Sequence, residues 1–445
     1  MQQIYCAIDV PAEFKDKALY GIRMLLLPFR IEPVFVDRVA LKGCSIYYGS
    51  DTSDLSPDTL HIGWVTQTIQ FFAQSEPKPL VSRYLRVADH RIPVLFEATG
   101  DLSYDPVATV VYYLSGWQEV HTTATDEHGR FAYEHSIQHE LGTADQPTVD
   151  WYRHLLAELL RKKGLHLERK EWGGKSWVFC PTHDIDYDKK WRPGIYKREL
   201  LDRAVLNSER ESVFQRVDRA FEAAKSMFHD EDPFRHAFVR MRDEVARRGW
   251  RATYFMKSGG SGLRDVAYSL TDSFVFQQLT ELNRNKFEIG HHPSYHSFLS
   301  IDKLHSEKAT LEAVCGFPIQ SHRAHYLRYS HPSSAHQIQA SGFSIDSTLG
   351  FATRCGFRHA TCLPFLLYDP LQDIELGVME MPLVCMESAL FNRMNLNLEQ
   401  AQLATHDMME TCAQFGGAFI ALWHNTLWDE SDYPGWGDHF ISTLS

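Results

Sequence analysis

The chain has 445 residues, of which 44% are hydrophobic and 23% are charged, as in a globular protein with substantial cores. This length is sufficient for two or three domains. The formal net charge of −12 argues against a general role in nucleic-acid binding, which would need a basic surface.

The N-terminal residues lack the basic start and apolar core of a signal peptide, and the apolar run at residues 25–27 is too short to span a membrane. The eight cysteines include no Cys-x-x-Cys pair. This pattern fits free thiols in a reducing compartment better than a disulfide framework. The sequence therefore predicts a cytoplasmic protein without a membrane span.

The pattern of the first third of the sequence predicts an α/β domain, which we place at residues 1–145 and which is smaller than the domain that follows it. Its expected strands lie at residues 44–48, 60–64 and 93–96. The run at residues 108–114 fits either a strand or a buried helix, because periodicity does not distinguish them. His128, in the turn at residues 126–131, is interpreted as part of a solvated loop rather than of a site.

A helix at residues 149–163 is predicted by apolar side chains at helical spacing, and Gly164 would end it. We assign this helix to a linking segment, residues 146–175, which follows the N-terminal domain. The remaining residues, 176–445, form the second predicted domain.

Predicted strands and helices alternate throughout residues 176–445. The strands fall at residues 177–180, 252–256, 287–289, 319–322, 343–345, 378–381 and 419–423, and helices are expected among others at residues 234–245, 301–315 and 398–415. Alternation of this kind indicates a parallel sheet with right-handed crossovers, either open or closed into a barrel. In such barrels the chemistry lies at the C-terminal ends of the strands.

Asp184 and Asp186 follow the first of these strands. Two carboxylates two residues apart repel each other, and partial burial disfavours both ionised forms. A divalent cation or a pair of basic groups would relieve the repulsion. Taken alone, the pair fits a helix-cap aspartate plus a surface aspartate as well as it fits a functional site.

His292 and His296 follow the third strand and are four residues apart. Pro293 suits the first position of a helix, in which the i,i+4 spacing would place both imidazoles on one face. Together with Asp186 they would form a facial set of metal ligands that leaves positions open to water and substrate. The alternative is a pair of polar loop residues.

The other strand ends supply candidate acid–base groups. Asp184 would take a proton from a water at the metal. Arg323, after the fourth strand, would hold Asp184 ionised. His424, after the last strand, would protonate a leaving group, and Asp346 would orient Arg323 or His424. Taken singly, Arg323 fits a surface salt bridge as well as it fits this role. Asp346 likewise fits a helix cap as well as it fits an orienting role.

Five segments in this order resemble the five motifs of the NodB-type polysaccharide deacetylases, carbohydrate esterase family 4. They are residues 182–186 (THDID), 292–296 (HPSYH), 323–326 (RAHY), 346–349 (DSTL) and 422–424 (LWH). The loops look closer to an intracellular bacterial subgroup in which an uncharacterised N-terminal domain precedes the barrel. In the second motif His291 is an alternative to His292 as the first metal histidine.

The resemblance implies a distorted (β/α)7 barrel behind the smaller α/β domain, and one divalent metal ion, usually Zn²⁺ and sometimes Co²⁺ or Ni²⁺. It implies hydrolysis of an acetyl group on a sugar or glycoconjugate, with Asp184 as base and His424 as acid. The metal ligands would be Asp186, His292 and His296. The oligomeric state is left open.

Three further residues are candidates for substrate binding. Tyr326 and Trp423 lie in motif loops, where aromatic rings either stack on sugars or pack the loops together. Arg358, in the loop after Asp346, either binds an anionic substrate group or is solvated.

Two other functions remain open at this point. The chain could be a non-catalytic carbohydrate-binding protein on the same fold, although every catalytic position is present. It could also be a metal-dependent hydrolase of a non-sugar amide.

Overall fold

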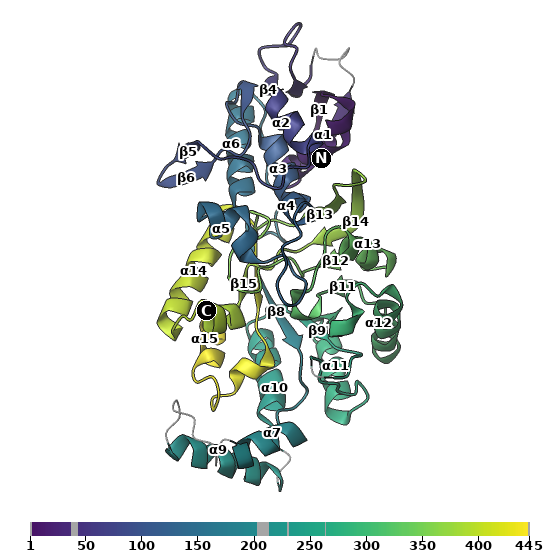
Figure 1. Cartoon of the computed structure of the whole chain (residues 1–445), viewed down its shortest axis with the longest axis vertical. Helices are drawn as coiled ribbons and strands as arrows, with labels where there is room; N and C mark the ends of the chain where they lie inside the picture. Colours follow the sequence, from purple (N-terminus) through teal and green to yellow (C-terminus); the bar gives the residue numbers. More distant parts are fainter. Residues whose placement is uncertain (1, 37–42, 203–212, 229–230, 263, 444–445) are drawn as a thin grey trace.

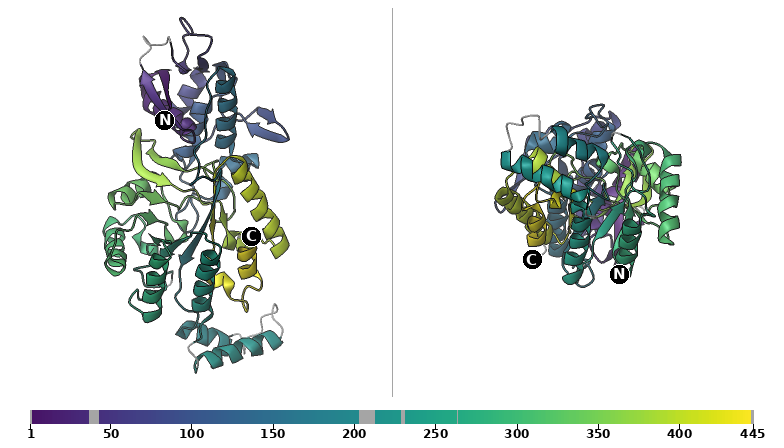
Figure 2. Two further views of the ribbon diagram at one scale, coloured as in Figure 1. Left: turned by 180° about the vertical axis from the view of Figure 1, so that it is seen from behind. Right: turned by 90° about the horizontal axis from the view of Figure 1, so that it is seen from below.

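The computed structural model describes residues 2–36, 43–202, 213–228, 231–262 and 264–443. The molecule is elongated, with the N-terminal elements at one end, a large sheet in the middle, and helices α7 (Pro193–Lys197) and α9 (Val213–Ser226) at the other end (Figure 1). The view from behind shows the same order along the long axis (Figure 2).

The N-terminal region contains a five-stranded sheet in the order β2-β1-β3-β4-β7, parallel except for the last pair. Its strands are β1 (Gln2–Asp9), β2 (Ile31–Val36), β3 (Ile46–Gly49), β4 (Leu60–Trp64) and β7 (Ala98–Gly100). The predicted strands at 44–48 and 60–64 are confirmed as β3 and β4. The strand expected at 93–96 is wrong, because β6 (His90–Pro93) ends there and pairs with β5 (Tyr84–Val87).

Residues 108–114, which periodicity left open, belong to helix α3 (Pro106–Leu114). The Asp105 side chain accepts a hydrogen bond from the Ala108 N–H at 2.9 Å, and Pro106 occupies the first turn. Every residue of α3 is buried, because the helix packs against α1 (Ala12–Leu26), α6 (Thr148–Lys162) and β13 (Phe365–Asp369). A helix buried on all sides has no polar face, so its sequence lacks the alternation of apolar and polar residues that reveals the 3.6-residue helical period.

The large sheet has nine strands in the order β13-β14-β12-β11-β10-β9-β8-β16-β15, parallel except for β13 against β14. The seven predicted strands are all present, as β8 (Val178–Ile185), β9 (Thr253–Met256), β10 (Glu288–His291), β11 (Ser321–His322), β12 (Ile345–Asp346), β14 (Ile374–Glu380) and β16 (Ala418–Leu422). Two strands were not predicted, namely β13 and the two-residue β15 (Cys385–Met386).

The expected barrel does not close within the described residues, and the sheet has β13 and β15 as its edges. The segment between β14 and β15 crosses the opening. The Met381 N–H donates to the Asp346 carbonyl at 2.7 Å, and the Val384 N–H donates to the Ile420 carbonyl at 3.0 Å. Each bond extends an existing pairing, β12 with β14 and β15 with β16, so neither closes the sheet at this position.

Helices surround the large sheet, with α14 and α15 on one side in Figure 1 and α11, α12 and α13 on the other. They are α10 (Pro233–Arg247), α11 (Ser273–Arg284), α12 (Ile301–Cys315), α13 (Ser333–Ala340), α14 (Leu398–Gln414) and α15 (Trp436–Thr443). The helices predicted at 234–245, 301–315 and 398–415 are confirmed as α10, α12 and α14.

Hydrogen bonds and ring contacts join the N-terminal region to the large sheet. The Asp150 carboxylate accepts bonds from Arg153 at 2.7 Å and from the Cys362 N–H at 2.7 Å. The Tyr20 and Tyr368 rings stack with centroids 4.3 Å apart. Helix α6 packs on α1 and α3, so it lies with the N-terminal elements. The boundaries at residues 145 and 175 remain a proposal.

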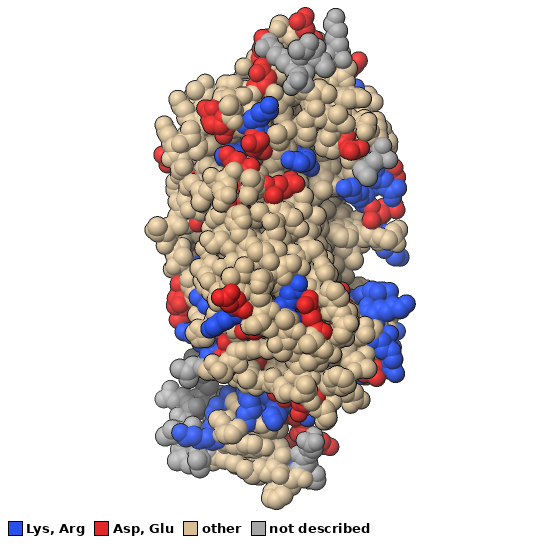
Figure 3. All heavy atoms as spheres, turned by 90° about the vertical axis from the view of Figure 1, so that its right-hand side faces the viewer, with Lys and Arg blue, Asp and Glu red and all other residues tan. Residues whose placement is uncertain are grey.

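None of the helices in the described ranges is both long enough and apolar enough to cross a bilayer. Acidic and basic side chains lie intermingled on the face drawn in Figure 3. The eight cysteines are free thiols.

Asp105 makes stability depend on pH. Burial raises the pKa of Asp105 to about 6 from its ordinary 3.8, although Ala108 and Tyr48 donate hydrogen bonds to it. Between these two values the folded chain binds more protons than the unfolded chain, so this group lowers the free energy of unfolding as pH rises. Asp105→Asn keeps the cap without titrating. From pH 4.5 to 7.5, its stability relative to the native chain should improve by about 2 kcal/mol.

Chemical denaturation of both proteins at several pH values measures this difference. An offset between the two that stays constant across the range would contradict a raised pKa at Asp105.

Candidate active site

Asp184 and Asp186 lie at the C-terminal end of β8, the strand between β9 and β16. Side chains two residues apart in a strand point to the same face, so both carboxylates turn to one side while Ile185 enters the core. Asp184 is 2% exposed, and the Asp186 side chain is 17% exposed. The two-residue spacing of Asp184 and Asp186 therefore brings their carboxylates together.

Three side chains converge beside this strand end, namely Asp186, His292 and His325, with their ligand atoms within 4.8 Å of one another. The Asp186 Oδ1 atom lies 3.1 Å from His292 Nε2 and 3.3 Å from His325 Nε2. His292 directly follows β10, and His325 opens a short 3₁₀ helix after β11. Two imidazoles and a carboxylate are a typical ligand set for a catalytic zinc-type ion.

The prediction that His296 is a metal ligand is wrong. Residues 292–294 do not continue as an α-helix, since Ser294 is extended and only a 3₁₀ turn, Tyr295–Ser297, follows. Without an α-helix, the i,i+4 spacing does not place the His292 and His296 imidazoles on one face. His296 lies exposed against the Tyr295 ring. His325 takes the place that His296 was expected to fill.

The direction of the side chains decides whether His291 or His292 can be the first metal histidine. His291 is buried on the opposite side of β10, where its Nε2 lies 3.1 Å from the Ser258 hydroxyl and its ring stacks on Phe343. His292, the next residue, turns toward Asp186. Alternation along the strand permits only one of the two neighbours to reach the cluster.

The outer ring nitrogens of the two cluster histidines are both held by acceptors. His292 Nδ1 lies 2.8 Å from the Arg323 carbonyl, and His325 Nδ1 lies 2.9 Å from the Asp265 carboxylate. Because these oxygens only accept, each Nδ1 carries the hydrogen, and in the neutral imidazole the Nε2 lone pair faces inward. Burial lowers the pKa of His325, which favours this neutral form.

Inward lone pairs on two imidazoles meet a carboxylate oxygen that has no hydrogen-bond partner among the described residues. Burial by itself would raise the pKa of Asp186, but His325, His292 and His424 hold it well below its usual range. That effect requires positive charge at the ring nitrogens: protons when no ion is bound, or a metal ion when the Nε2 lone pairs are free to bind it. The residues therefore fit a divalent metal held by Asp186, His292 and His325.

Arg323 contacts Asp184, as the sequence predicted. Its Nη1 lies 3.2 Å from Asp184 Oδ1 and 2.6 Å from the Thr182 hydroxyl. The Nε and Nη2 atoms donate to the Ser347 carbonyl at 2.8 Å and to its hydroxyl at 2.7 Å. A fully buried guanidinium fixed at four points keeps the Asp184 carboxylate in one place and paired.

His424 is oriented by Glu387, a residue that the sequence reasoning missed. Glu387 Oε1 accepts from the His424 N–H at 2.7 Å and lies 2.6 Å from Nδ1, so Nε2 faces Asp186 Oδ2 at 3.7 Å. Burial opposes charging of this ring, but Glu387, Asp186 and Asp184 raise the pKa of His424 to about 10. His424 is thus protonated at neutral pH, as a proton donor must be.

The expectation that Asp346 orients Arg323 or His424 is wrong. Its Oδ1 accepts from the Thr348 hydroxyl at 2.7 Å and lies 2.8 Å from His322 Nδ1. His322 is the last residue of β11 and directly precedes Arg323, and alternation turns it to the other face of the sheet. Asp346 therefore supports the sheet beside the site.

Two of the three substrate-binding candidates are also wrong. Trp423 is fully buried and packs on His439 and Phe440, away from the site. Arg358 is buried in a two-point ion pair with Glu119, at 2.8 and 2.6 Å. Tyr326 is 37% exposed and lines the same cavity as the cluster.

A cavity of about 470 Å³ opens over these groups. Among its walls are Asp184, Asp186, Tyr187, His292, His325, Tyr326, Asn392, Arg393 and His424, joined by His128 and Arg130 from the N-terminal region. The interpretation of His128 as part of a solvated loop is wrong, because it is 5% exposed. Arg130 donates to the Tyr326 carbonyl at 2.6 Å, and Arg328 donates to the His128 carbonyl at 2.8 Å.

One of the missed residues carried a sequence signal. His325 stands two residues after Arg323, the same spacing that unites Asp184 and Asp186 on one face, although the chain turns into a 3₁₀ helix there. Glu387 follows the two-residue strand β15, and His128 comes from a distant segment, so neither had a local pattern to reveal it.

Comparisons with known proteins cover both parts of the chain. Residues 21–165 match the model of a family of unknown function, DUF7033. No curated protein matches the sequence. Several solved structures are similar at low level. A protein from Mycobacterium smegmatis assigned as a polysaccharide deacetylase is 15% identical, with 62% of this chain and 87% of that chain covered and a TM-score of 0.40.

The chitin deacetylase of the fungus Colletotrichum lindemuthianum is 14% identical over 60% of this chain and 80% of its own, with a TM-score of 0.30. The catalytic domain of a peptidoglycan N-acetylglucosamine deacetylase from Eubacterium rectale is 12% identical over 60% of this chain and 84% of its own, with a TM-score of 0.27. Likeness at this level says nothing about substrate, and the proposals below rest on the side chains of the site.

Metal binding distinguishes the observed ligand set from the predicted one. Asp186→Asn, His292→Gln and His325→Gln should each lower metal occupancy at this cluster, because each removes a donor atom. His296→Gln should leave occupancy unchanged, because its ring is exposed outside the cluster. Isothermal titration of each metal-stripped variant with Zn²⁺ gives the affinities. Tight binding that survives His325→Gln but is lost in His296→Gln would restore the sequence-based assignment.

Proposed function

We propose that the chain is a metal-dependent hydrolase that removes an acetyl group from an N- or O-acetylated sugar or glycoconjugate. The observation that carries this proposal is the joint presence of three groups in one cavity. These are the Asp186–His292–His325 cluster, a buried carboxylate at Asp184, and the His424 imidazole held by Glu387. The order of the five motif-like segments along the chain supports the same reaction class.

The cluster would hold one divalent ion, with Zn²⁺ as first choice and Co²⁺ or Ni²⁺ as alternatives, since imidazole and carboxylate donors suit these ions. When bound, such an ion supplies Lewis acidity that polarises an acyl oxygen and lowers the pKa of water.

Asp184 would act as the base. Its carboxylate is 2% exposed and held by Arg323, so it has one position from which to accept a proton. It lies 3.7 Å from His292 Nε2, beside the cluster. Water adds to the acyl carbon while its proton passes to Asp184.

His424 would act as the acid. The Glu387 carboxylate keeps the ring charged and turns its Nε2–H toward the cavity. As the bond between acyl carbon and amide nitrogen breaks, this proton passes to the departing amine. Acetate and a free amine result, or an alcohol when the acetyl group is bound to oxygen.

Substrate selection would involve Tyr326 and the N-terminal loop that carries His128 and Arg130. Tyr326 offers the partly exposed ring at the cavity wall, and Arg130 holds its backbone in place. A metal-dependent hydrolase of a non-sugar amide would use the same cluster. A substrate panel that includes both acetylated sugars and simple acetamides separates these two functions.

Loss of the acid or the base should slow turnover strongly without loss of metal. Asp184→Asn and His424→Gln should each lower kcat by about 10²–10⁴-fold, because each removes one proton-transfer group. Both variants keep Asp186, His292 and His325. Acetate release from acetylated mono-, oligo- and polysaccharides measures the effect, with His296→Gln as a surface histidine control.

Metal occupancy of each variant is measured in the same samples. The proposal fails if the metal-replete native chain releases no acetate from any member of the panel. It also fails if Asp184→Asn retains native rates at full occupancy.

A further inference from the structure

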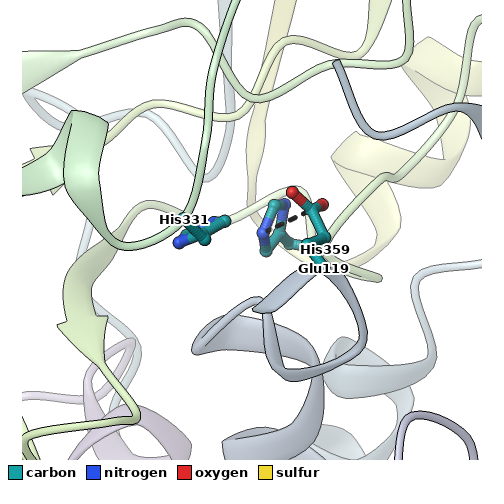
Figure 4. A group of neighbouring side chains, drawn as sticks. All are labelled: Glu119, His331 and His359. Atoms are coloured by element: carbon teal, nitrogen blue, oxygen red, sulfur yellow. Dashed lines mark ion pairs between the residues drawn. The ribbon is translucent and has the colours of Figure 1, made fainter. Parts of the chain in front are cut away.

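A second cluster of potential metal ligands lies where the N-terminal region meets the large sheet. It consists of Glu119, His331 and His359, whose ligand atoms all fall within 4.8 Å of one another. Glu119 comes from helix α4 (Trp117–Val120), and the two histidines come from loops beside α13 and before β13 (Figure 4). None of the three residues lines the active-site cavity described above.

The two imidazoles of this cluster are buried without any hydrogen bond. His331 is 9% exposed and His359 is 1% exposed. Within the part of the chain that the structure describes, both ring nitrogens of each residue lack a hydrogen-bond partner. A buried polar group without a partner costs about 1–3 kcal/mol. Two such rings side by side therefore indicate that something else occupies the space between them.

Glu119 supplies the anionic member of the cluster. Its side chain is 4% exposed, and one oxygen lies 4.0 Å from His359 Nε2, the contact drawn as a dashed line in Figure 4. Arg358 donates to both carboxylate oxygens, but each oxygen has a second lone pair that remains available. Arg358 thus fixes the carboxylate in direction while its charge weakens the attraction for a cation.

Close packing fixes the position of His331. A Cβ atom at Gly116, the residue that precedes α4, would lie 2.5 Å from the His331 ring. Only glycine permits this approach. The imidazole is therefore wedged against the backbone of the N-terminal region, on the same short helix start that presents Glu119.

We propose that Glu119, His331 and His359 bind a second divalent transition-metal ion, which ties helix α4 to the two loops of the large-sheet region. Two imidazole nitrogens and a carboxylate oxygen suit zinc, cobalt or nickel rather than calcium or magnesium. Ligand atoms around a tetrahedral zinc ion lie about 3.4 Å apart. The donors would draw together by small side-chain rotations, and water would complete the coordination.

The consequence is a cross-link between segments that are far apart in the sequence. Such an ion binds only where all three segments meet, so it stabilises the folded chain and not the unfolded one. Because of the adjacent Arg358 guanidinium, this site should bind metal more weakly than the Asp186 cluster and should release it first to a chelator.

Metal stoichiometry tests the proposal independently of any enzymatic activity. The full-length chain, stripped and then dialysed against Zn²⁺, is compared with two double variants by elemental analysis. Asp186→Asn with His292→Gln removes the first cluster, and His331→Gln with His359→Gln removes the second. We expect two equivalents in the native chain and one in each double variant. His296→Gln serves as a control for a surface histidine and should keep both.

Thermal unfolding supplies a second readout. In the Asp186→Asn, His292→Gln background, adding Zn²⁺ should raise Tm and a chelator should reverse the change. Adding Glu119→Gln should abolish this response. The proposal is overturned if the Asp186→Asn, His292→Gln variant binds no Zn²⁺ and shows no Zn²⁺-dependent Tm, which would mean that water fills the space. Because this background keeps the second cluster intact, the test does not depend on whether the His331→Gln, His359→Gln variant folds.

Discussion

The candidate site depends on the close approach of Asp186 Oδ1 to two imidazole nitrogens. The oxygen lies 3.1 and 3.3 Å from the Nε2 atoms of His292 and His325 and has no hydrogen-bond partner within the described ranges. The Arg323 carbonyl and the Asp265 carboxylate bind the outer nitrogens. These outer bonds fix the tautomer, so the lone pairs face one another and create a place for a cation.

The surrounding residues keep this arrangement rigid. Asp265, which holds His325, is itself bonded by Lys257 at 3.1 Å and by the Tyr295 N–H at 2.9 Å. Burial would raise the pKa of Asp265, but His325 and Lys257 hold it well below its usual range. The orienting carboxylate is thus favoured in its charged form. A fixed acceptor behind each histidine limits ligand movement in metal sites.

The N-terminal region takes part in the site and is more than a separate appendage. Its loop at residues 126–131 brings His128 and Arg130 into the cavity wall, where Arg130 bonds the Tyr326 backbone. Ion pairs such as Glu119 with Arg358 join the two parts elsewhere, with the side chains only 4% and 2% exposed. Buried pairs of this kind are costly to break, because each partner would be left as an unpaired charge. A substitution in the N-terminal region should therefore alter the site directly through these contacts, in addition to any effect on the stability of the fold.

The sequence by itself determined seven of the nine strands of the large sheet, because apolar runs bounded by turns are local signals. It also determined Asp184, Asp186, His292, Arg323 and His424 as residues at strand ends, since parallel strands bring those ends to one edge. It did not determine His325, Glu387 or His128. It also failed for Trp423 and Arg358, which face the core. Side-chain direction after a strand ends depends on the turn that follows, and contacts between distant segments have no period in the sequence, so only the tertiary structure decided them.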